Sequence, residues 1–321
     1  MAKYYLFKFL AVCCCTSVMC SCSAKVKTAE VSDFVFDTYA HISVCGKAPQ
    51  ATAEEISDCF KELDEAFSLC YEKTAELLPQ NTVYDDCTDK TLELSQKYGE
   101  GISVFCGELT ALWGIATDCP KIPADDDIQK ALYSVSLEKD YTETSMLDFG
   151  AVAKGYACDT AYKILKESNA EYSTVSLGSS TLLYGEKTGN KPFRAGVTNP
   201  DNPEGYLGVI ETQSAFISTS GGYERFFEAD GKRYSHILDM NTGRPVETDL
   251  SSVTVIVPSD TEGGGFLSDF LSTLIYIDGS ENLDKWLSYE EFSLVCADVN
   301  GKVYTDFDGF TLDEESGYSY G

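Results

Sequence analysis

The sequence predicts an α+β protein whose sheets are mostly antiparallel. Apolar residues at helical spacing are found mainly before Leu147, in residues 156–166 and in residues 267–277. From Leu147 to Val257, glycines and short β-rich runs dominate, which is typical of strands separated by turns. Helices grouped apart from such a strand set indicate the α+β class.

Each element has its own signal. Residues 34–44 have strand composition, residues 51–78 alternate apolar and acidic residues at helical spacing, and residues 79–90 form a polar connection. Acidic residues precede the helix expected from Ile128, as is usual in a first turn. Asn300-Gly301 indicates a hairpin turn within residues 292–304. Further helices are expected at 91–97, 102–115, 128–132, 156–166 and 267–277, and strands at 172–177, 206–211, 215–219 and 252–257.

Composition excludes several classes of protein. The 321 residues include 24 Lys and Arg against 52 Asp and Glu, a net charge of −28. A chain this acidic repels polyanions, so we expect no nucleic-acid partner. The hydrophobic fraction of 43% argues against general disorder. After the N-terminal segment no run of apolar residues is long enough to predict a membrane span.

The N-terminal residues read as an export signal. Lys3 and Lys8 precede a short apolar run, and small polar residues follow. Within this segment, Met19-Cys20-Ser21-Cys22 resembles a bacterial lipobox, and Cys22 is a better lipidation site than Cys20, which follows Met19. We therefore expect residues 1–22 to be a lipoprotein signal peptide and 23–32 a tether. The protein would be exported and held by a lipid on Cys22 at the outer face of the cytoplasmic membrane. Cleavage without a lipid is the alternative.

The cysteines do not predict a metal site. Five of the 13 lie in the signal segment, and the other eight show no CxxC pair and no His at zinc-site spacing. Whether they are free thiols or disulfides stays open. The eight are Cys45, Cys59, Cys70, Cys87, Cys106, Cys119, Cys158 and Cys296.

A glycine- and alanine-rich segment, DFGAVAKGYACD at residues 148–159, leads into a helical pattern. Backbone N–H groups at the start of a helix can bind an anion, and Lys154 adds a positive charge. The spacing fits neither a P-loop nor GxGxxG. The pattern alone leaves open whether this segment binds phosphate or is a tight turn that packs a helix.

A second polar constellation surrounds one of the two histidines. STSGGYER at residues 218–225 and RYSHILDMNTGRP at residues 233–245 place hydroxyls, glycines and arginines near His236. A single histidine can be a catalyst or a structural residue with satisfied hydrogen bonds. His41, in the strand-like FDTYAHISV, has no such neighbours, and we take it as structural.

A third constellation lies in the apolar segment LSDFLSTLI at residues 267–275. On a helix, Asp269 and Thr273 are i and i+4, so a carboxylate and a hydroxyl share one face. A hard cation such as Mg²⁺ could partner a buried carboxylate there. Capping of the helix N-terminus by Ser268 or Asp269 is the alternative.

Together, these segments resemble the ApbE family of bacterial FAD:protein FMN transferases. DFGAVAKGYACD is similar to the family's Asp-Leu-Gly-Gly-Ile-Ala-Lys-Gly-Tyr-x-x-Asp, and SDFLST to its Ala-Asp-x-x-x-Thr. The middle block is similar to the family's Thr-Ser-Gly-x-Tyr-Glu-Arg and His-Ile-Ile-Asp-Pro-x-Thr-Gly-x-Pro. The resemblance implies a T-fold-like α+β domain over residues 33–315, with mixed, mostly antiparallel sheets and packed helices.

The resemblance also implies a function and a set of site residues. The enzyme would use Mg²⁺ and FAD, move FMN from FAD onto a Thr or Ser hydroxyl of an acceptor protein, and release AMP. His236, Asp269 and Lys154 would be catalytic, while the Ala151 carbonyl, Asp269 and Thr273 would hold the metal. The implied FAD-site residues are Phe36, Tyr71, Gly101, Ile102, Ser103, Asp148, Lys154 and Leu238.

Some positions depart from the family pattern. Leu177-Gly178-Ser179-Ser180 stands where the family has Leu-Gly-Gly-Asn or Leu-Gly-Gly-Asp, and Met240 replaces a proline. Ser103 replaces an aspartate and Phe36 a methionine. Residues 263–265, three glycines, are inserted before the metal motif, so we expect a longer and more flexible approach to that helix.

Two other functions remain open at the level of sequence. The same site could let water replace the acceptor hydroxyl, which would make the protein a Mg²⁺-dependent FAD pyrophosphatase. It could also be a flavin-binding lipoprotein without chemistry on FAD. No Asp-x-x-Ser/Thr-Gly-Ala-Thr/Ser acceptor segment occurs in the chain, which disfavours a covalent flavin carrier.

Overall fold

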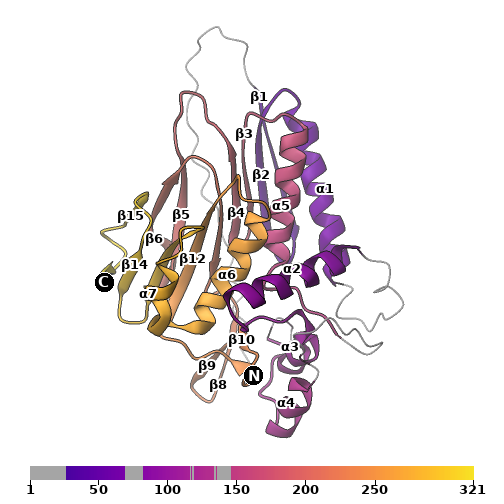
Figure 1. Cartoon of the computed structure of the whole chain (residues 1–321), viewed down its shortest axis with the longest axis vertical. Coiled ribbons are helices and arrows are strands. Elements are labelled where there is room, and N and C mark those ends of the chain that lie inside the picture. The colour runs from indigo at the N-terminus through magenta and orange to yellow at the C-terminus, as the bar shows by residue number, and fades with distance from the viewer. Residues whose placement is uncertain (1–26, 69–81, 116, 118, 134, 136–145) are drawn as a thin grey trace.

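A computed structural model describes residues 27–68, 82–115, 117, 119–133, 135 and 146–321. In these residues a nine-stranded sheet is covered by helices on one face, and a three-stranded sheet packs on part of the other (Figure 1). The nine strands are antiparallel except for the last pair, β14 and β16. The α+β class and the mostly antiparallel sheets predicted from the sequence are therefore confirmed.

Helices α1, α5 and α6 lie on the large sheet, while α3 and α4 pack together at one end of the molecule near β8 to β10 (Figure 1). The helices are α1 (Pro49–Ser68), α2 (Thr82–Tyr98), α3 (Gly107–Trp113), α4 (Asp125–Leu132), α5 (Ala153–Glu167), α6 (Gly264–Asp278) and α7 (Leu283–Trp286). Short 3-10 turns occupy Val104–Cys106 and Ser280–Asn282.

The strands of the large sheet stand in chain order, but the chain leaves this sheet after β4 for the smaller sheet and returns at β7. In spatial order the large sheet contains β1 (Lys27–Val35), β2 (Thr38–Gly46), β3 (Tyr172–Leu177), β4 (Ser180–Gly185), β7 (Ala215–Ser220), β12 (Leu250–Pro258), β13 (Ser293–Asp298), β14 (Lys302–Thr305) and β16 (Ser319–Tyr320). The small sheet contains β15 (Phe310–Leu312), β6 (Asn202–Thr212) and β5 (Phe193–Asn199). Two ribbons complete the set, β8 (Phe226–Ala229) with β9 (Lys232–Ser235), and β10 (Leu238–Asp239) with β11 (Arg244–Pro245).

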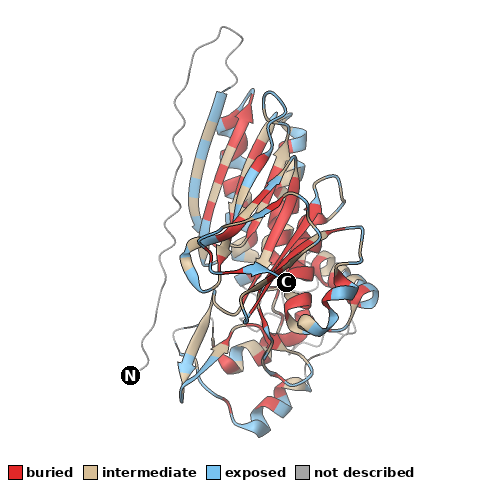
Figure 2. Cartoon of the chain, turned by 90° about the vertical axis from the view of Figure 1, so that its left-hand side faces the viewer, coloured by how far each residue is buried: buried red, intermediate tan, exposed pale blue. Residues whose placement is uncertain are grey.

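The central strands are apolar on both faces because each face is covered. On β12, Val253, Val255 and Val257 join the core under the helices, whereas Ile256 joins the core between the two sheets. Successive side chains of a strand point to opposite faces, so one run of valine and isoleucine supplies both cores. By contrast, the edge strand β1 is partly or fully exposed along most of its length (Figure 2).

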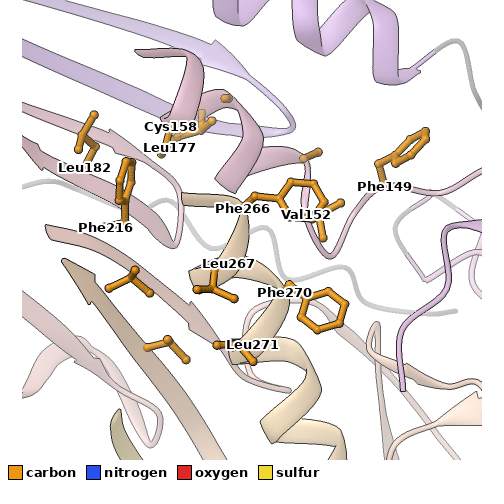
Figure 3. Packing of buried hydrophobic residues seen from close by; sticks show 14 of the residues in the cluster. Phe149, Val152, Cys158, Leu177, Leu182, Phe216, Phe266, Leu267, Phe270 and Leu271 are labelled. Carbon is orange, nitrogen blue, oxygen red and sulfur yellow. The ribbon is translucent and has the colours of Figure 1, made fainter. Parts of the chain in front are cut away.

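The core under the helices holds α5 and α6 against the sheet. Figure 3 shows its packing at close range. Side chains from α6, from the segment before α5 and from β3, β4 and β7 share this cluster, among them Phe149, Val152, Leu177, Leu182, Phe216, Phe266 and Phe270. The two helices that carry the DFGAVAKGYACD and SDFLST motifs are therefore fixed against one another.

Residues 34–44, predicted as one strand, form a hairpin. β1 and β2 pair from Lys27↔Gly46 to Val35↔Thr38, and the turn residues Phe36 and Asp37 both have φ of 53°. Such left-handed turn positions usually carry Gly or Asn, so this turn is hidden in the sequence. Residues 27–32, which we expected to be part of a tether, belong to β1.

Helix α2 starts at Thr82, so most of the expected polar connection 79–90 is helical. Tyr84, Cys87, Thr88 and Thr91 are buried at helical spacing, but the two threonines hide that pattern in a hydropathy profile. The helices expected at 128–132, 156–166 and 267–277, the four expected strands and the terminal hairpin are confirmed, with shifted bounds. Strands β4 and β5 were not expected. No disulfide joins the seven body cysteines of the described residues to one another, and Cys70 lies outside those residues.

Candidate active site

Residues of the DFGAVAKGYACD and SDFLST motifs meet where α5 crosses α6. Gly155 on α5 faces Gly265 and Asp269 on α6: a Cβ at Gly155 would lie 2.3 Å from the Gly265 carbonyl oxygen and 2.7 Å from Asp269 Cβ. No side chain fits in that space, so the two backbones can approach only because residue 155 is glycine. This contact brings the start of α5 against the Asp269 carboxylate.

Asp269 is a buried carboxylate, 2% exposed. Its Oδ2 accepts a hydrogen bond from the Gly155 backbone N–H at 2.9 Å, and its Oδ1 accepts one from the Ser180 hydroxyl at 3.2 Å. Burial raises the pKa of Asp269 above its ordinary value, and Lys154 and these hydrogen bonds offset only part of that rise. The Lys154 ammonium lies 3.9 Å from Oδ1, too far for a direct hydrogen bond.

Asp269 and Thr273 share one face of α6, as their spacing predicted. The Thr273 hydroxyl lies 3.3 Å from the Asp269 carbonyl oxygen and 3.0 Å from the Ser220 hydroxyl. Ala151 is half-buried in the turn that leads into α5. In the described residues no group of three or more His, Cys, Asp or Glu side chains could hold a metal ion, so a metal here would depend on one carboxylate with hydroxyl and carbonyl oxygens.

The glycine insertion does not form the flexible approach that we expected. Gly264 and Gly265 are buried in the first turn of α6. The Asp159 carboxylate of α5 accepts hydrogen bonds there from the Gly265 N–H at 2.8 Å and the Phe266 N–H at 2.9 Å. The N-terminus of α6 is thus capped by a side chain of α5 and not by a residue of α6. Ser268 and Asp269, the capping alternatives, lie inside the helix.

His236 is held by the backbone of Arg225. The Arg225 carbonyl accepts from the His236 N–H at 3.0 Å and from the ring Nδ1 at 3.1 Å. A carbonyl only accepts, so Nδ1 carries the proton and the neutral ring presents an unprotonated Nε2. Burial, with the charges of Arg225 and Lys154, lowers the pKa of His236 to about 4. His236 is therefore neutral at pH 7.

Arg225 also ties the β1–β2 hairpin to this region. Its guanidinium donates to the Asp37 carbonyl oxygen at 3.2 Å and lies 3.8 Å from the Asp37 carboxylate. Phe36, in the same turn, packs its ring 6.1 Å from that of Phe67. The hairpin residue predicted for the FAD site is thus linked through Arg225 to His236.

The other segments predicted for the FAD site lie together. The Asp148 N–H donates to the Val104 carbonyl at 2.8 Å, which joins the loop 101–103 to the segment before α5. Ile102 and Ser103 are each 5% exposed. A Cβ at Gly101 would lie 2.6 Å from the Leu274 side chain, so the loop rests on α6 one turn beyond Asp269.

A cavity of about 290 Å³ lies beside this loop and is lined by residues that include Gly101, Asp239, Leu274 and Lys285. Leu238 itself is buried among the side chains of α3 and α4, so only its backbone is available to a ligand. Tyr71 lies outside the described residues.

A larger hollow of about 600 Å³ lies along α1, away from the motif residues. Its lining includes Glu54, Glu55, Asp58 and Glu62. Four carboxylates on one helix face repel an anion such as a dinucleotide, so this hollow is a poor candidate for FAD.

Sequence reasoning missed Gly155 and Ser180 as site residues, although both stand in segments that it quoted. Their roles depend on contacts across the fold, because Gly155 meets α6 and Ser180 meets Asp269 from β4. The only signal for Ser180 was its departure from the family pattern.

Comparison with known proteins agrees with the resemblance. A FAD:protein FMN transferase of Salmonella typhimurium is 29% identical over 205 residues, which cover 59% of this chain and 58% of that relative. One from Treponema pallidum is 24% identical, over 87% of this chain and 86% of the relative. Among solved structures, the ApbE protein of Thermotoga maritima has a TM-score of 0.73 and 25% identity, covering 90% of this chain and 97% of its own.

A flavin transferase ApbE of Vibrio cholerae has the same fold, with a TM-score of 0.70, 23% identity, and coverage of 89% of this chain and 96% of its own. The model of the ApbE family matches residues 36–295, which include all three motif segments. This chain therefore belongs to the ApbE family.

Proposed function

We propose that this protein is a Mg²⁺-dependent FAD:protein FMN transferase that moves FMN from FAD onto a Thr or Ser hydroxyl of an acceptor protein and releases AMP. The observation that carries the proposal is the buried Asp269 carboxylate, which lies next to Lys154 at the crossing of α5 and α6. Two relatives that bear this activity in their names match 59% and 87% of the chain.

The oxygen atoms at the crossing suit a hard divalent cation. An ionised carboxylate has about four acceptor positions, and the hydrogen bonds from Gly155 and Ser180 occupy only part of them. Asp269, the Thr273 hydroxyl and the Ala151 carbonyl would hold Mg²⁺, which prefers such ligands. When bound, Mg²⁺ would neutralise charge that develops on the phosphoryl oxygens.

Lys154 and His236 would bind the substrate and accept the proton. The Lys154 ammonium would attract the pyrophosphate of FAD, a role that matters in a chain with a net charge of −28. Nε2 of His236 would accept the proton of the acceptor hydroxyl as its oxygen attacks the phosphorus of the FMN moiety. The new P–O bond replaces the phosphoanhydride bond, and AMP leaves. The segments around Gly101, Asp148 and Phe36 would orient the flavin and adenine rings.

An acceptor assay tests this function. The protein is incubated with FAD, Mg²⁺ and a flavin-acceptor domain, and the products are separated under denaturing conditions. Flavin fluorescence on the denatured acceptor, with one AMP per flavin, is the expected result. Free FMN with AMP and no labelled acceptor would show a pyrophosphatase, and unchanged FAD would show a flavin-binding protein without catalysis. AMP release that survives Asp269→Ala would refute the metal-dependent mechanism.

The location is also a proposal. The described residues contain no helix long and apolar enough to cross a membrane, and residues 1–26 lie outside them. We infer from the lipobox-like sequence that the protein is exported and anchored to the membrane through a lipid on Cys22. Mass spectrometry of the mature N-terminus tests this, because a diacylglyceryl group on Cys22 supports the anchor and an unmodified terminus refutes it.

A further inference from the structure

Three buried serines form a hydrogen-bonded series that ends on Asp269. Ser268 of α6, Ser218 of β7 and Ser180 of β4 are each at most 1% exposed. The Ser268 and Ser218 hydroxyls lie 2.9 Å apart, Ser218 donates to Ser180 at 3.2 Å, and Ser180 donates to Asp269 Oδ1 at 3.2 Å. We call these three residues the serine series.

The direction of these hydrogen bonds follows from the chemistry of the groups. An ionised carboxylate only accepts, so the single hydroxyl proton of Ser180 is committed to Asp269. Ser180 is then free to accept from Ser218. Ser268 can give its proton to Ser218 or to the Gly265 carbonyl, which is 2.9 Å away. The hydroxyl of Ser180 is thus oriented by Ser218 toward the carboxylate.

The serine series fixes one oxygen of Asp269, while α5 fixes the other. Oδ2 is held by the Gly155 N–H at 2.9 Å. Because β4 holds one oxygen and α5 holds the other, the carboxylate plane cannot rotate without breaking a buried hydrogen bond. Leaving a buried polar group unpaired costs about 1–3 kcal/mol.

We propose that Ser180, supported by Ser218, is a positioning residue that holds Asp269 in the orientation in which it binds a divalent cation. This inference rests on the proposed function, because it presupposes the cation site. Groups that orient a metal ligand from outside the ligand set commonly change metal affinity by about 10–100-fold when removed. Here the group comes from β4, at a position where the family pattern has Asn or Asp.

The chain offers a matched control. Ser252 on β12 is also fully buried, but its hydroxyl has no hydrogen-bond partner within the described part of the chain. Ser252→Ala therefore removes a buried serine hydroxyl without touching the serine series. Ser218→Ala removes the support of Ser180 but leaves its hydrogen bond to Asp269 in place.

The test measures Mn²⁺ binding to the full mature chain without FAD, by the electron paramagnetic resonance signal of free Mn²⁺. Ser180→Ala is expected to weaken binding by about 10–100-fold, and Ser218→Ala to weaken it less. Ser252→Ala should bind as the unsubstituted chain does. The thermal unfolding midpoint of each variant in EDTA reports folding separately. If Ser180→Ala does not fold, the smaller loss of Mn²⁺ affinity expected for Ser218→Ala is measured in its place.

Two results would overturn the inference in different ways. If folded Ser180→Ala binds Mn²⁺ as tightly as the unsubstituted chain, the positioning role is refuted and the cation site stands. Where Ser180→Ala does not fold, the same result for folded Ser218→Ala has the same meaning. No Mn²⁺ binding by the unsubstituted chain, or binding unchanged by Asp269→Ala, would refute the cation site and with it both proposals. Equal weakening by Ser252→Ala would show a general packing effect and would also refute the positioning role.

Discussion

At the scale of single residues, His236 has the clearest physical signature. A lone histidine in a polar segment can be structural, and the sequence could not decide. The structure places its Nδ1 on the Arg225 carbonyl and leaves Nε2 unprotonated. The positive charges of Arg225 and Lys154, added to burial, then keep the ring neutral. A neutral imidazole offers the lone pair of Nε2 to a hydroxyl proton, but the nearby cations make it a weak base and it cannot bind phosphate by charge.

This arrangement predicts a pH dependence of stability. The folded-state pKa of about 4 lies below the ordinary value of 6.5, so the unfolded chain binds more protons between these values and stability falls as pH decreases from 6.5 to 4. Asn at position 236 can donate to the Arg225 carbonyl but cannot titrate. When the pH is lowered from 6.5 to 4.5, the free energy of unfolding of His236→Asn should therefore fall by about 1–2 kcal/mol less than that of the unsubstituted chain.

Urea unfolding of both chains at the two pH values measures this difference. The other titrating groups are common to both chains, so they cancel in the comparison. Equal losses of unfolding free energy in the two chains would mean that His236 is not held neutral by the fold.

At the scale of elements, the crossing of α5 and α6 is the feature on which the site depends. Gly155→Ala should destabilise the fold by about 1–3 kcal/mol, because its Cβ would overlap the Gly265 carbonyl oxygen and Asp269 Cβ. Denaturant unfolding measures this loss. Lys163→Ala, on the exposed face of the same helix, should change stability by less than about 0.5 kcal/mol. If Gly155→Ala is as stable as Lys163→Ala, then α5 and α6 can move apart to make room for the Cβ at position 155 without loss of stability.

The capping of α6 by Asp159 gives a second prediction for the same pair of helices. Asp159→Ala leaves the N–H groups of Gly265 and Phe266 without their acceptor, which should lower the free energy of unfolding by about 1–3 kcal/mol at pH 7.5. Asp58→Ala, which removes an exposed ion pair with Lys61 on α1, should cost less than about 1 kcal/mol. A loss for Asp159→Ala no larger than that for Asp58→Ala, in urea unfolding, would contradict the capping role.

These elements also show how far the sequence could be interpreted. Helical spacing predicted α5 and α6, and the i, i+4 relation of Asp269 and Thr273 placed them on one face. Phe36 and Asp37 both have a φ of 53°, but neither is a glycine that would indicate a turn in the sequence, so the hairpin of β1 and β2 was not predicted. The role of the glycine insertion was misjudged, because three glycines read as a flexible segment unless the opposing helix is known. Pairwise contacts such as Ser180 with Asp269 need the fold.

At the scale of the whole molecule, net charge is the dominant property. Composition alone predicts no nucleic-acid partner, but the proposed substrate is itself an anion. The site resolves this conflict locally, since Lys154 and Arg225 lie at the motif residues, and His236 stays neutral under their influence. The acidic hollow along α1 shows the opposite environment elsewhere on the surface. Binding of an anion therefore depends on a few placed cations rather than on the overall field.

The same charge predicts how salt affects stability. A net charge of −28 at pH 7 makes the compact state repel itself, and the Debye length shortens from about 30 Å at 0.01 M to about 8 Å at 0.15 M ionic strength. Raising NaCl from 0.01 to 0.15 M at pH 7.5 should therefore increase the thermal unfolding midpoint by several degrees. Near pH 4.5, close to the sequence isoelectric point of about 4.3, the same addition should have little effect. A midpoint that falls with NaCl at pH 7.5, or rises equally at both pH values, would show that self-repulsion does not limit the stability of this fold.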